Sequence, residues 1–162
     1  MESWSLDKGA QYFHLCQNES IDGIELSEEL LKKLVDRVKS EIPDAIITTD
    51  VSSSIASRDF SKFDLWQDLG VVYGGAQKNL GTSGLTFVCV RNDVLERVKD
   101  IRQNQKIPFP VNMDWTKQAS ASDKFVNTPS MFSIFTSQLM CEHMLKLGGI
   151  EFFDHKATKK SR

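Results

Sequence analysis

Short apolar runs, separated by polar or glycine-containing stretches, make up the first part of the chain. Four of them have the length of strands and end at polar residues or glycine, at 12–16, 45–49, 71–73 and 85–90. Runs of this length with such boundaries predict the strands of a buried sheet. The run at 85–90 is expected to be as buried as the others.

Apolar residues at helical spacing lie between these strands. The clearest helix is predicted at 27–42, with Glu28 and Glu29 in its first turn and Pro43 ending it; its apolar positions are Leu30, Leu31, Leu34, Val35, Val38 and Ile42. A shorter helix is predicted at 92–102. Because helices and strands alternate, the chain is expected to be an α/β protein.

A third long helix is predicted near the end of the chain. Thr128 is expected to be its N-cap and Pro129 its first residue, the helical position that tolerates proline best. Gly148-Gly149 should close it. His143 lies on its apolar stripe and is expected to be a packed side chain rather than a ligand. Another helix is expected to follow, up to the last residue.

Two stretches lack a clear period. The segment 58–69 is interpreted as a surface segment whose apolar residues pack onto the core, at Phe60, Phe63, Leu65 and Trp66. The second stretch, 103–126, is long and irregular, and such loops in compact domains are usually functional or mobile. The sequence assigns this second stretch no role.

Composition narrows the classes of function. A chain of 162 residues with 40% hydrophobic and 26% charged residues is typical of one globular domain, and a net charge of −2 gives no reason to expect a nucleic acid or an anionic membrane as partner. Cys16, Cys89 and Cys141 lack metal-type spacing, and the last two are expected to be buried, reduced thiols. Without an apolar leader or a membrane-length run, a cytoplasmic chain is expected.

One lysine lies between two glycine-containing turns, in the order Gly74-Gly75-Ala76-Gln77-Lys78-Asn79-Leu80-Gly81. A phosphate-binding loop would require glycine before the lysine and serine or threonine after it, where Gln77 and Asn79 stand. The alternative is a lysine that forms a Schiff base with the aldehyde of pyridoxal phosphate. This cofactor also needs an acid opposite its ring nitrogen. Asp50 directly follows the predicted strand 45–49, where α/β proteins place ligand groups.

Several segments in register make the pattern specific. The segments 50–58, 75–81 and 84–86 resemble phosphoserine aminotransferase, within the class V aminotransferases that use pyridoxal phosphate; 18–23 before them and 127–130 after them agree in order. The resemblance runs from about Tyr12 almost to the end of the chain. It implies part of the large domain of a fold-type I aminotransferase, with a mainly parallel sheet flanked by helices. Residues 1–162 would then lack the N-terminal part and the C-terminal small domain.

The resemblance also implies roles for individual residues. Lys78 would hold pyridoxal phosphate and move the substrate proton, while Asp50 would keep the ring nitrogen protonated. The other expected cofactor contacts are Ser20, where the family usually has threonine, and Gln77, Asn127 and Thr128. Asn127 and Thr128 would reach the cofactor of a neighbouring subunit, which implies a homodimer. The implied substrates are glutamate and 3-phosphohydroxypyruvate, in serine biosynthesis.

Other interpretations remain open. A related class V enzyme such as a cysteine desulfurase would share Lys78 and Asp50, although it normally has histidine where Gln77 stands. A truncated chain could be non-catalytic and bind only a partner subunit. Taken singly, Lys78 could be a lysine extending from a strand end, Asp50 a turn acid, and Ser20 a turn residue.

Overall fold

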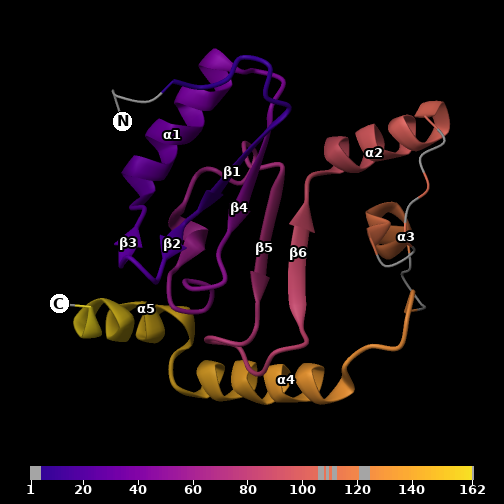
Figure 1. Ribbon diagram of the computed structural model, residues 1–162. Coiled ribbons are helices and arrows are strands. Elements are labelled where there is room, and N and C mark those ends of the chain that lie inside the picture. Colours follow the sequence, from indigo (N-terminus) through magenta and orange to yellow (C-terminus); the bar gives the residue numbers. More distant parts are fainter. Residues whose placement is uncertain (1–4, 106–107, 109, 111–112, 121–124, 162) are drawn as a thin grey trace.

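A four-stranded sheet forms the centre of the protein. The computed structural model describes residues 5–105, 108, 110, 113–120 and 125–161. The strands of this sheet lie in the order β1-β4-β5-β6 (Figure 1). Their bounds are β1 Tyr12–Cys16, β4 Ile46–Asp50, β5 Val71–Gly75 and β6 Thr86–Val90. β1, β4 and β5 are parallel, whereas β6 is antiparallel to β5. The prediction of an α/β fold with a mainly parallel sheet is confirmed.

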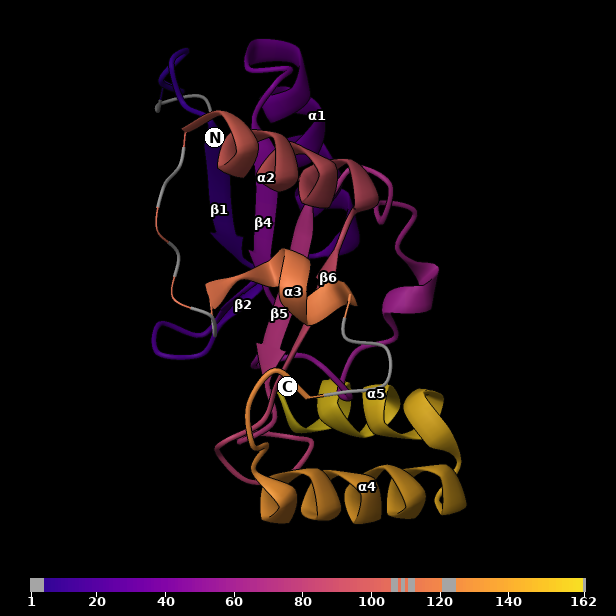
Figure 2. The same ribbon diagram turned by 90° about the vertical axis from the view of Figure 1, so that its right-hand side faces the viewer.

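Helix α1 (Glu28–Glu41) builds the core on one face of this sheet. The hydroxyl of Ser27 caps it by accepting a hydrogen bond from the Leu30 N–H at 3.3 Å. Its apolar stripe is buried as predicted, except for the half-buried Leu30. The core cluster joins Leu31, Val35 and Val38 of this helix to Leu15 on β1, Ile47 on β4 and Val72 on β5. Each such side chain stabilises the fold by roughly 1.5–3 kcal/mol. Helices α2 (Asn92–Gln105) and α3 (Trp115–Ser120) lie toward the opposite face (Figure 2).

A small hairpin follows β1, in a stretch where the sequence predicted no strand. β2 (Asn18–Glu19) pairs antiparallel with β3 (Ile24–Glu25). The buried side chain of Gln17 stabilises the hairpin, because its Nε2 donates to the carbonyl of Leu26 at 2.8 Å. The turn of this hairpin is at 20–23, and Ser20 lies at its start.

Two expectations about burial were wrong. β6 is largely exposed rather than buried, with Val88 44% exposed, because it lies at an edge of the sheet in the described part of the chain. Cys89, on this strand, is exposed, and so is Cys141 on a later helix. An apolar run alone does not distinguish a central strand from an edge strand.

The two aperiodic stretches, 58–69 and 103–126, differ in how well the structure agrees with the interpretation from sequence. In the first, a short 3-10 helix η1 (Phe60–Lys62) leads to Leu65, which is only 2% exposed, while Phe60 and Phe63 pack against the core. This agrees with the interpretation from sequence, although Trp66 is 45% exposed. In the second, helix α3 was not predicted; the residues around it at 106–107, 109, 111–112 and 121–124 lie outside the described residues.

Helix α4 (Met131–Lys146) starts later than the sequence predicted. Ser130 is its N-cap residue, so the assignment of Thr128 as N-cap and of Pro129 as the first helical residue was wrong. The Ser130 hydroxyl bonds to that of Ser133 at 2.8 Å rather than to a backbone N–H, next to the loop that contains Gly84. The C-terminal end is as predicted, because Gly148 has a φ of 111° directly after the helix. Helix α5 (Gly149–Lys160) follows, as expected.

α4 packs through its small polar side chains and exposes its apolar ones. Ser133 and Ser137 are buried against the loop 81–84, and the Ser133 hydroxyl donates to the carbonyl of Ser83 at 2.7 Å. The predicted apolar stripe is at least one-third exposed, at Met131, Phe132, Phe135, Leu139, Met140 and Leu147. His143 is exposed too, so the expectation of a packed histidine was wrong. Within the described residues, nothing covers this face of α4.

Candidate active site

The carboxyl ends of three parallel strands meet at one edge of the sheet. There the strand register pairs Asp50, the last residue of β4, with Cys16 on β1 and with Tyr73 on β5. Paired residues on neighbouring strands point to the same face. The Asp50 carboxylate also turns back onto the following loop, where it accepts a hydrogen bond from the Ser52 N–H at 2.7 Å.

The loop after Asp50 is fastened to the end of β5. The Val51 N–H donates to the carbonyl of Tyr73 at 2.9 Å, and the hydroxyl of Ser52 accepts from the Gly75 N–H at 3.0 Å. Gly75 ends β5, and a Cβ there would lie 2.1 Å from the side-chain oxygen of Gln77. The absence of a side chain at Gly75 therefore gives Gln77 room in its present conformation just before Lys78.

Lys78 extends toward two hydroxyl groups from distant parts of the chain. Its Nζ donates to the hydroxyl of Ser20, in the turn of the hairpin, at 3.1 Å, and to the hydroxyl of Ser53 at 2.5 Å. The neighbouring Asn79 holds the same loop, because its Nδ2 donates to the carbonyls of Ser53 at 3.1 Å and Ile55 at 2.9 Å. The loop 51–55 thus connects the carboxylate of Asp50 to the amine of Lys78.

Sequence reasoning did not select three residues that shape this site. Ser52 orients Asp50 and Gly75, Ser53 contacts the amine of Lys78, and Asn79 fixes the loop between them. A signal was present, since three consecutive serines follow Asp50 and a run of hydroxyls directly after a strand end favours a polar turn.

The other predicted contacts lie apart from this cluster or at its surface. Gln77 is exposed beside Gly75. Asn127 and Thr128 are exposed, and the Nδ2 of Asn127 donates a hydrogen bond to the carbonyl of the adjacent Thr128 at 3.4 Å. The structure therefore joins Ser20 to Lys78, while it does not bring Asn127 and Thr128 into contact with them.

Two weak acids flank Asp50. Burial raises the pKa of the Cys16 thiol, and the negative charges of Asp50 and Glu19 raise it further, although a hydrogen bond to Asn18 and the charge of Lys78 oppose them. Burial, the charge of Asp50 and a hydrogen bond to its carboxylate raise the pKa of Tyr73. Both flanking groups are therefore neutral at neutral pH.

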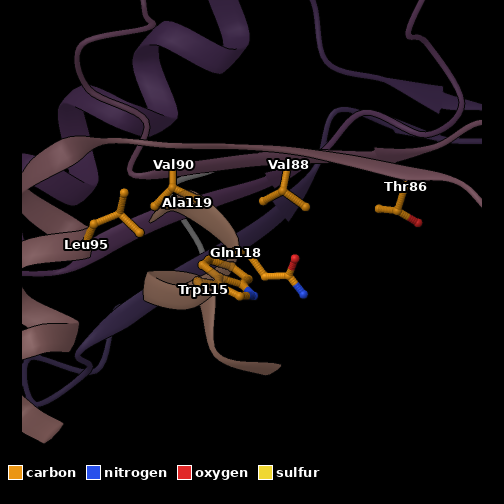
Figure 3. Close-up of a pocket in the computed structure, with 7 residues that line it drawn as sticks. All are labelled: Thr86, Val88, Val90, Leu95, Trp115, Gln118 and Ala119. Carbon is orange, nitrogen blue, oxygen red and sulfur yellow. The ribbon is translucent and has the colours of Figure 1, made fainter. Parts of the chain in front are cut away.

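One cavity adjoins the candidate site, and another lies elsewhere, beside β6. A cavity of about 550 Å³ opens beside Lys78 and Asn79 and is bounded by α4 and α5, with Met140, Met144, Phe153, Lys156 and Lys160 among its lining residues. A cavity of about 540 Å³ lies beside β6, between it and α3; Figure 3 shows its lining residues Thr86, Val88, Val90, Leu95, Trp115, Gln118 and Ala119. None of these seven side chains is an acid or a base near neutral pH, so this hollow is not a candidate for proton-transfer chemistry.

The residues at the strand ends fit a pyridoxal phosphate site. A primary amine, a carboxylate on the adjacent strand and hydroxyl groups around the amine supply the groups that such a cofactor requires.

Comparison with known proteins identifies the family. The model of the family described as aminotransferase class V matches residues 2–162. The chain belongs to the class V aminotransferases. The phosphoserine aminotransferase of Burkholderia orbicola is 34% identical over 161 residues, which are 98% of this chain and 38% of that protein. The chloroplastic phosphoserine aminotransferase 2 of Arabidopsis thaliana is 34% identical over 154 residues, or 94% of this chain and 31% of that protein.

Solved structures agree with the sequence relatives. The pyridoxal-phosphate-bound phosphoserine aminotransferase of Trichomonas vaginalis matches with a TM-score of 0.70 and 28% identity, over 96% of this chain and 37% of that one. The phosphoserine aminotransferase of Bacillus circulans subsp. alkalophilus matches with a TM-score of 0.67 and 30% identity, over 96% and 37%. The family and its cofactor-bound member indicate pyridoxal phosphate as the cofactor. This class V chain spans between about a third and two fifths of the length of these relatives.

None of the helices in the described ranges is both long and apolar enough to span a membrane.

Proposed function

We propose that the chain is the central part of a phosphoserine aminotransferase, which transfers an amino group between glutamate and 3-phosphohydroxypyruvate in serine biosynthesis. The observation that carries this proposal is the contact of the Lys78 amine with Ser20 and Ser53, one strand away from the carboxylate of Asp50. The class V family and relatives of that name support the reaction.

Lys78 is the proposed catalytic base and acid. When bound, pyridoxal phosphate supplies an aldehyde for the amine and a ring that withdraws electrons from the substrate carbon. The Nζ of Lys78, when it is a free amine, takes a proton from the substrate carbon and later returns one. The hydroxyls of Ser20 and Ser53 orient this nitrogen, because both accept its hydrogen bonds.

Asp50 is proposed to hold a proton at the ring nitrogen of the cofactor. Its position at the end of β4, with one oxygen bound by the Ser52 N–H, holds the carboxylate at this edge of the sheet. A negative charge held there keeps the ring nitrogen protonated and therefore favours electron withdrawal.

Further features of the proposal extend beyond the described contacts. Ser20 and Gln77 would contact the cofactor within the subunit. Asn127 and Thr128 lie away from Lys78, which is compatible with contacts to the cofactor of a second subunit in a homodimer. We propose that residues 1–162 form part of the large domain, with the N-terminal part and the C-terminal small domain lying outside them. We also propose that the enzyme is cytoplasmic.

Cofactor binding and turnover test the proposal in a full-length form, in which the chain is joined to the segments that its relatives carry on either side. Added pyridoxal phosphate should give a visible absorbance band that Lys78→Met abolishes, and consumption of more than one equivalent of glutamate per site should require 3-phosphohydroxypyruvate. Release of sulfur from cysteine without transamination would instead identify a desulfurase. Absence of the band in a folded protein would leave the non-catalytic interpretation.

A further inference from the structure

Tyr73 lies beside Asp50 on the face of the sheet that carries the candidate site. The parallel register of β4 and β5 pairs the two residues directly, so their side chains project from neighbouring positions. Burial raises the pKa of Tyr73, and the charge of the Asp50 carboxylate and its hydrogen bonding with the phenol hydroxyl raise it further. A neutral phenol can donate a hydrogen bond to a charged carboxylate at neutral pH.

The ring of Tyr73 is itself held in place from β1 and β4. His14 stacks on it, with ring centroids 6.0 Å apart and an angle of 16° between the planes. The Nδ1 of His14 lies 3.0 Å from the hydroxyl of Thr48, its register partner on β4. Stacking and hydrogen bonding therefore connect four residues on one face of the three strands, in the order Thr48, His14, Tyr73 and Asp50.

The carboxylate of Asp50 needs a second restraint. The Ser52 N–H binds one oxygen, and a single hydrogen bond leaves the carboxylate free to turn about it. We propose that Tyr73 is a positioning residue for Asp50: its hydroxyl fixes the carboxylate toward the cofactor ring, and His14, anchored by Thr48, fixes the phenol. This rests on the proposed function, because it assigns Tyr73 a task in the same site. At metal sites, mutation of a residue that orients a ligand in this way typically lowers metal affinity or activity by about 10–100-fold.

The contact can be measured without the cofactor. The chain has two tyrosines, Tyr12 and Tyr73, so Tyr12→Phe leaves a single phenol whose ionisation is followed by ultraviolet absorbance. The titratable groups facing it are Asp50 on β4 and His14 and Cys16 on β1. We expect Tyr73 to ionise at a higher pH than free tyrosine, and the added change Asp50→Asn to lower that pH. Cys16→Ser is the matched control on the other side of Asp50 and should have a smaller effect. The contact would be overturned if Tyr73 ionised at the same pH with Asp50 and with Asp50→Asn. Circular dichroism checks that both chains are folded.

The positioning role is measured in the full-length form. Tyr73→Phe keeps the ring that stacks on His14 and removes only the hydroxyl. We expect about a tenfold lower kcat with little change in KM, and a shift in the pH dependence of the bound cofactor's absorbance. An unchanged pH dependence and kcat would overturn the positioning role. A parent protein that never forms the cofactor band would contradict the proposed function instead, while the phenol titration of the chain would remain valid.

Discussion

The amine of Lys78 lies 3.1 Å from the hydroxyl of Ser20, a residue 58 positions earlier in the chain. The hairpin β2–β3 and the turn after β5 bring the two side chains together at one edge of the sheet. The amine donates hydrogen bonds to this hydroxyl and to that of Ser53 from its place beside the strand ends.

Removal of the Ser20 hydroxyl should weaken the site without unfolding the protein. In the full-length form, Ser20→Ala is expected to weaken pyridoxal phosphate binding about 5–10-fold, because an exposed hydrogen bond contributes roughly 1 kcal/mol. Ser20→Thr should bind nearly as the parent, since threonine keeps the hydroxyl. Absorbance titration with the cofactor measures both, and Ser40→Ala, an exposed serine on α1, is the control. Equal binding by the alanine and threonine variants would show that the hydroxyl has no role.

Lys78 should carry the cofactor covalently. In the full-length form, borohydride reduction after addition of pyridoxal phosphate is expected to label the peptide that contains Lys78, because the amine is the group that reacts with an aldehyde. Mass mapping of the peptides measures the label, and Lys78→Met should abolish it. Lys156 lines the neighbouring cavity and provides the internal comparison. A label on Lys156 or another lysine, with none on Lys78, would refute the assignment.

Asp50→Asn should affect turnover far more than folding. Asparagine still offers an oxygen to the Ser52 N–H, so the free energy of unfolding should change by no more than about 1 kcal/mol. A neutral amide cannot hold the ring proton, and kcat in the full-length form is expected to fall by about 10²–10⁴-fold. Denaturant unfolding and steady-state kinetics measure the two quantities. Near-normal turnover in a folded Asp50→Asn protein would mean that another group holds the proton.

Stability should depend on pH through the ion pairs of Arg58. This guanidinium binds Glu25 on β3, with Nη2 2.7 Å from Oε2, and lies 3.5 Å from the carboxylate of Asp154 on α5. The hydrogen bond from Arg58 lowers the pKa of Glu25. A lowered pKa in the folded state means that the pair stabilises the fold at neutral pH and that this contribution is lost as the pH falls through the folded pKa.

The variant Glu25→Gln isolates this contribution. It should destabilise the chain by about 1–2 kcal/mol at pH 7, and the difference from the parent should disappear below about pH 4. Urea unfolding at a series of pH values measures it, with Asp36→Asn on the exposed side of α1 as the matched control. A difference that stays constant down to the acid end would assign the effect to packing rather than to charge.

The exposed face of α4 should make the chain associate. Phe132 and Phe135 are 69% and 55% exposed, and no described segment covers them. Apolar surface of this kind promotes association, so residues 1–162 alone are expected to form oligomers or aggregates in light scattering, and to show weak cofactor binding and no transamination.

The double change Phe132→Glu with Phe135→Glu should reduce association and leave the circular dichroism spectrum unchanged, because both side chains are already exposed. Ile21→Glu is the control, since Ile21 is 90% exposed outside α4. A monodisperse parent chain with clear activity would contradict the expectation and show a more self-contained site.

The sequence alone determined the elements and the chemistry of the strand ends. Strand-length apolar runs and the helical stripe of 27–42 predicted β1, β4, β5 and α1, because local periodicity reports which side of an element is buried. Lys78 after a glycine-containing turn and Asp50 after an apolar run allowed the pyridoxal phosphate chemistry, and the flanking segments that resemble phosphoserine aminotransferase made it specific, since each residue taken singly has other uses.

The tertiary structure decided which surfaces are covered and which distant groups meet. The run at 85–90 and the stripe of α4 are apolar, yet both are largely exposed, because the burial of an apolar residue depends on what packs against it. The start of α4 followed its contact with the loop 81–84 rather than the Thr128-Pro129 signal. Ser53 beside Lys78 and Tyr73 beside Asp50 lie far from them in sequence, and only the parallel register and the loop after β4 bring these side chains together.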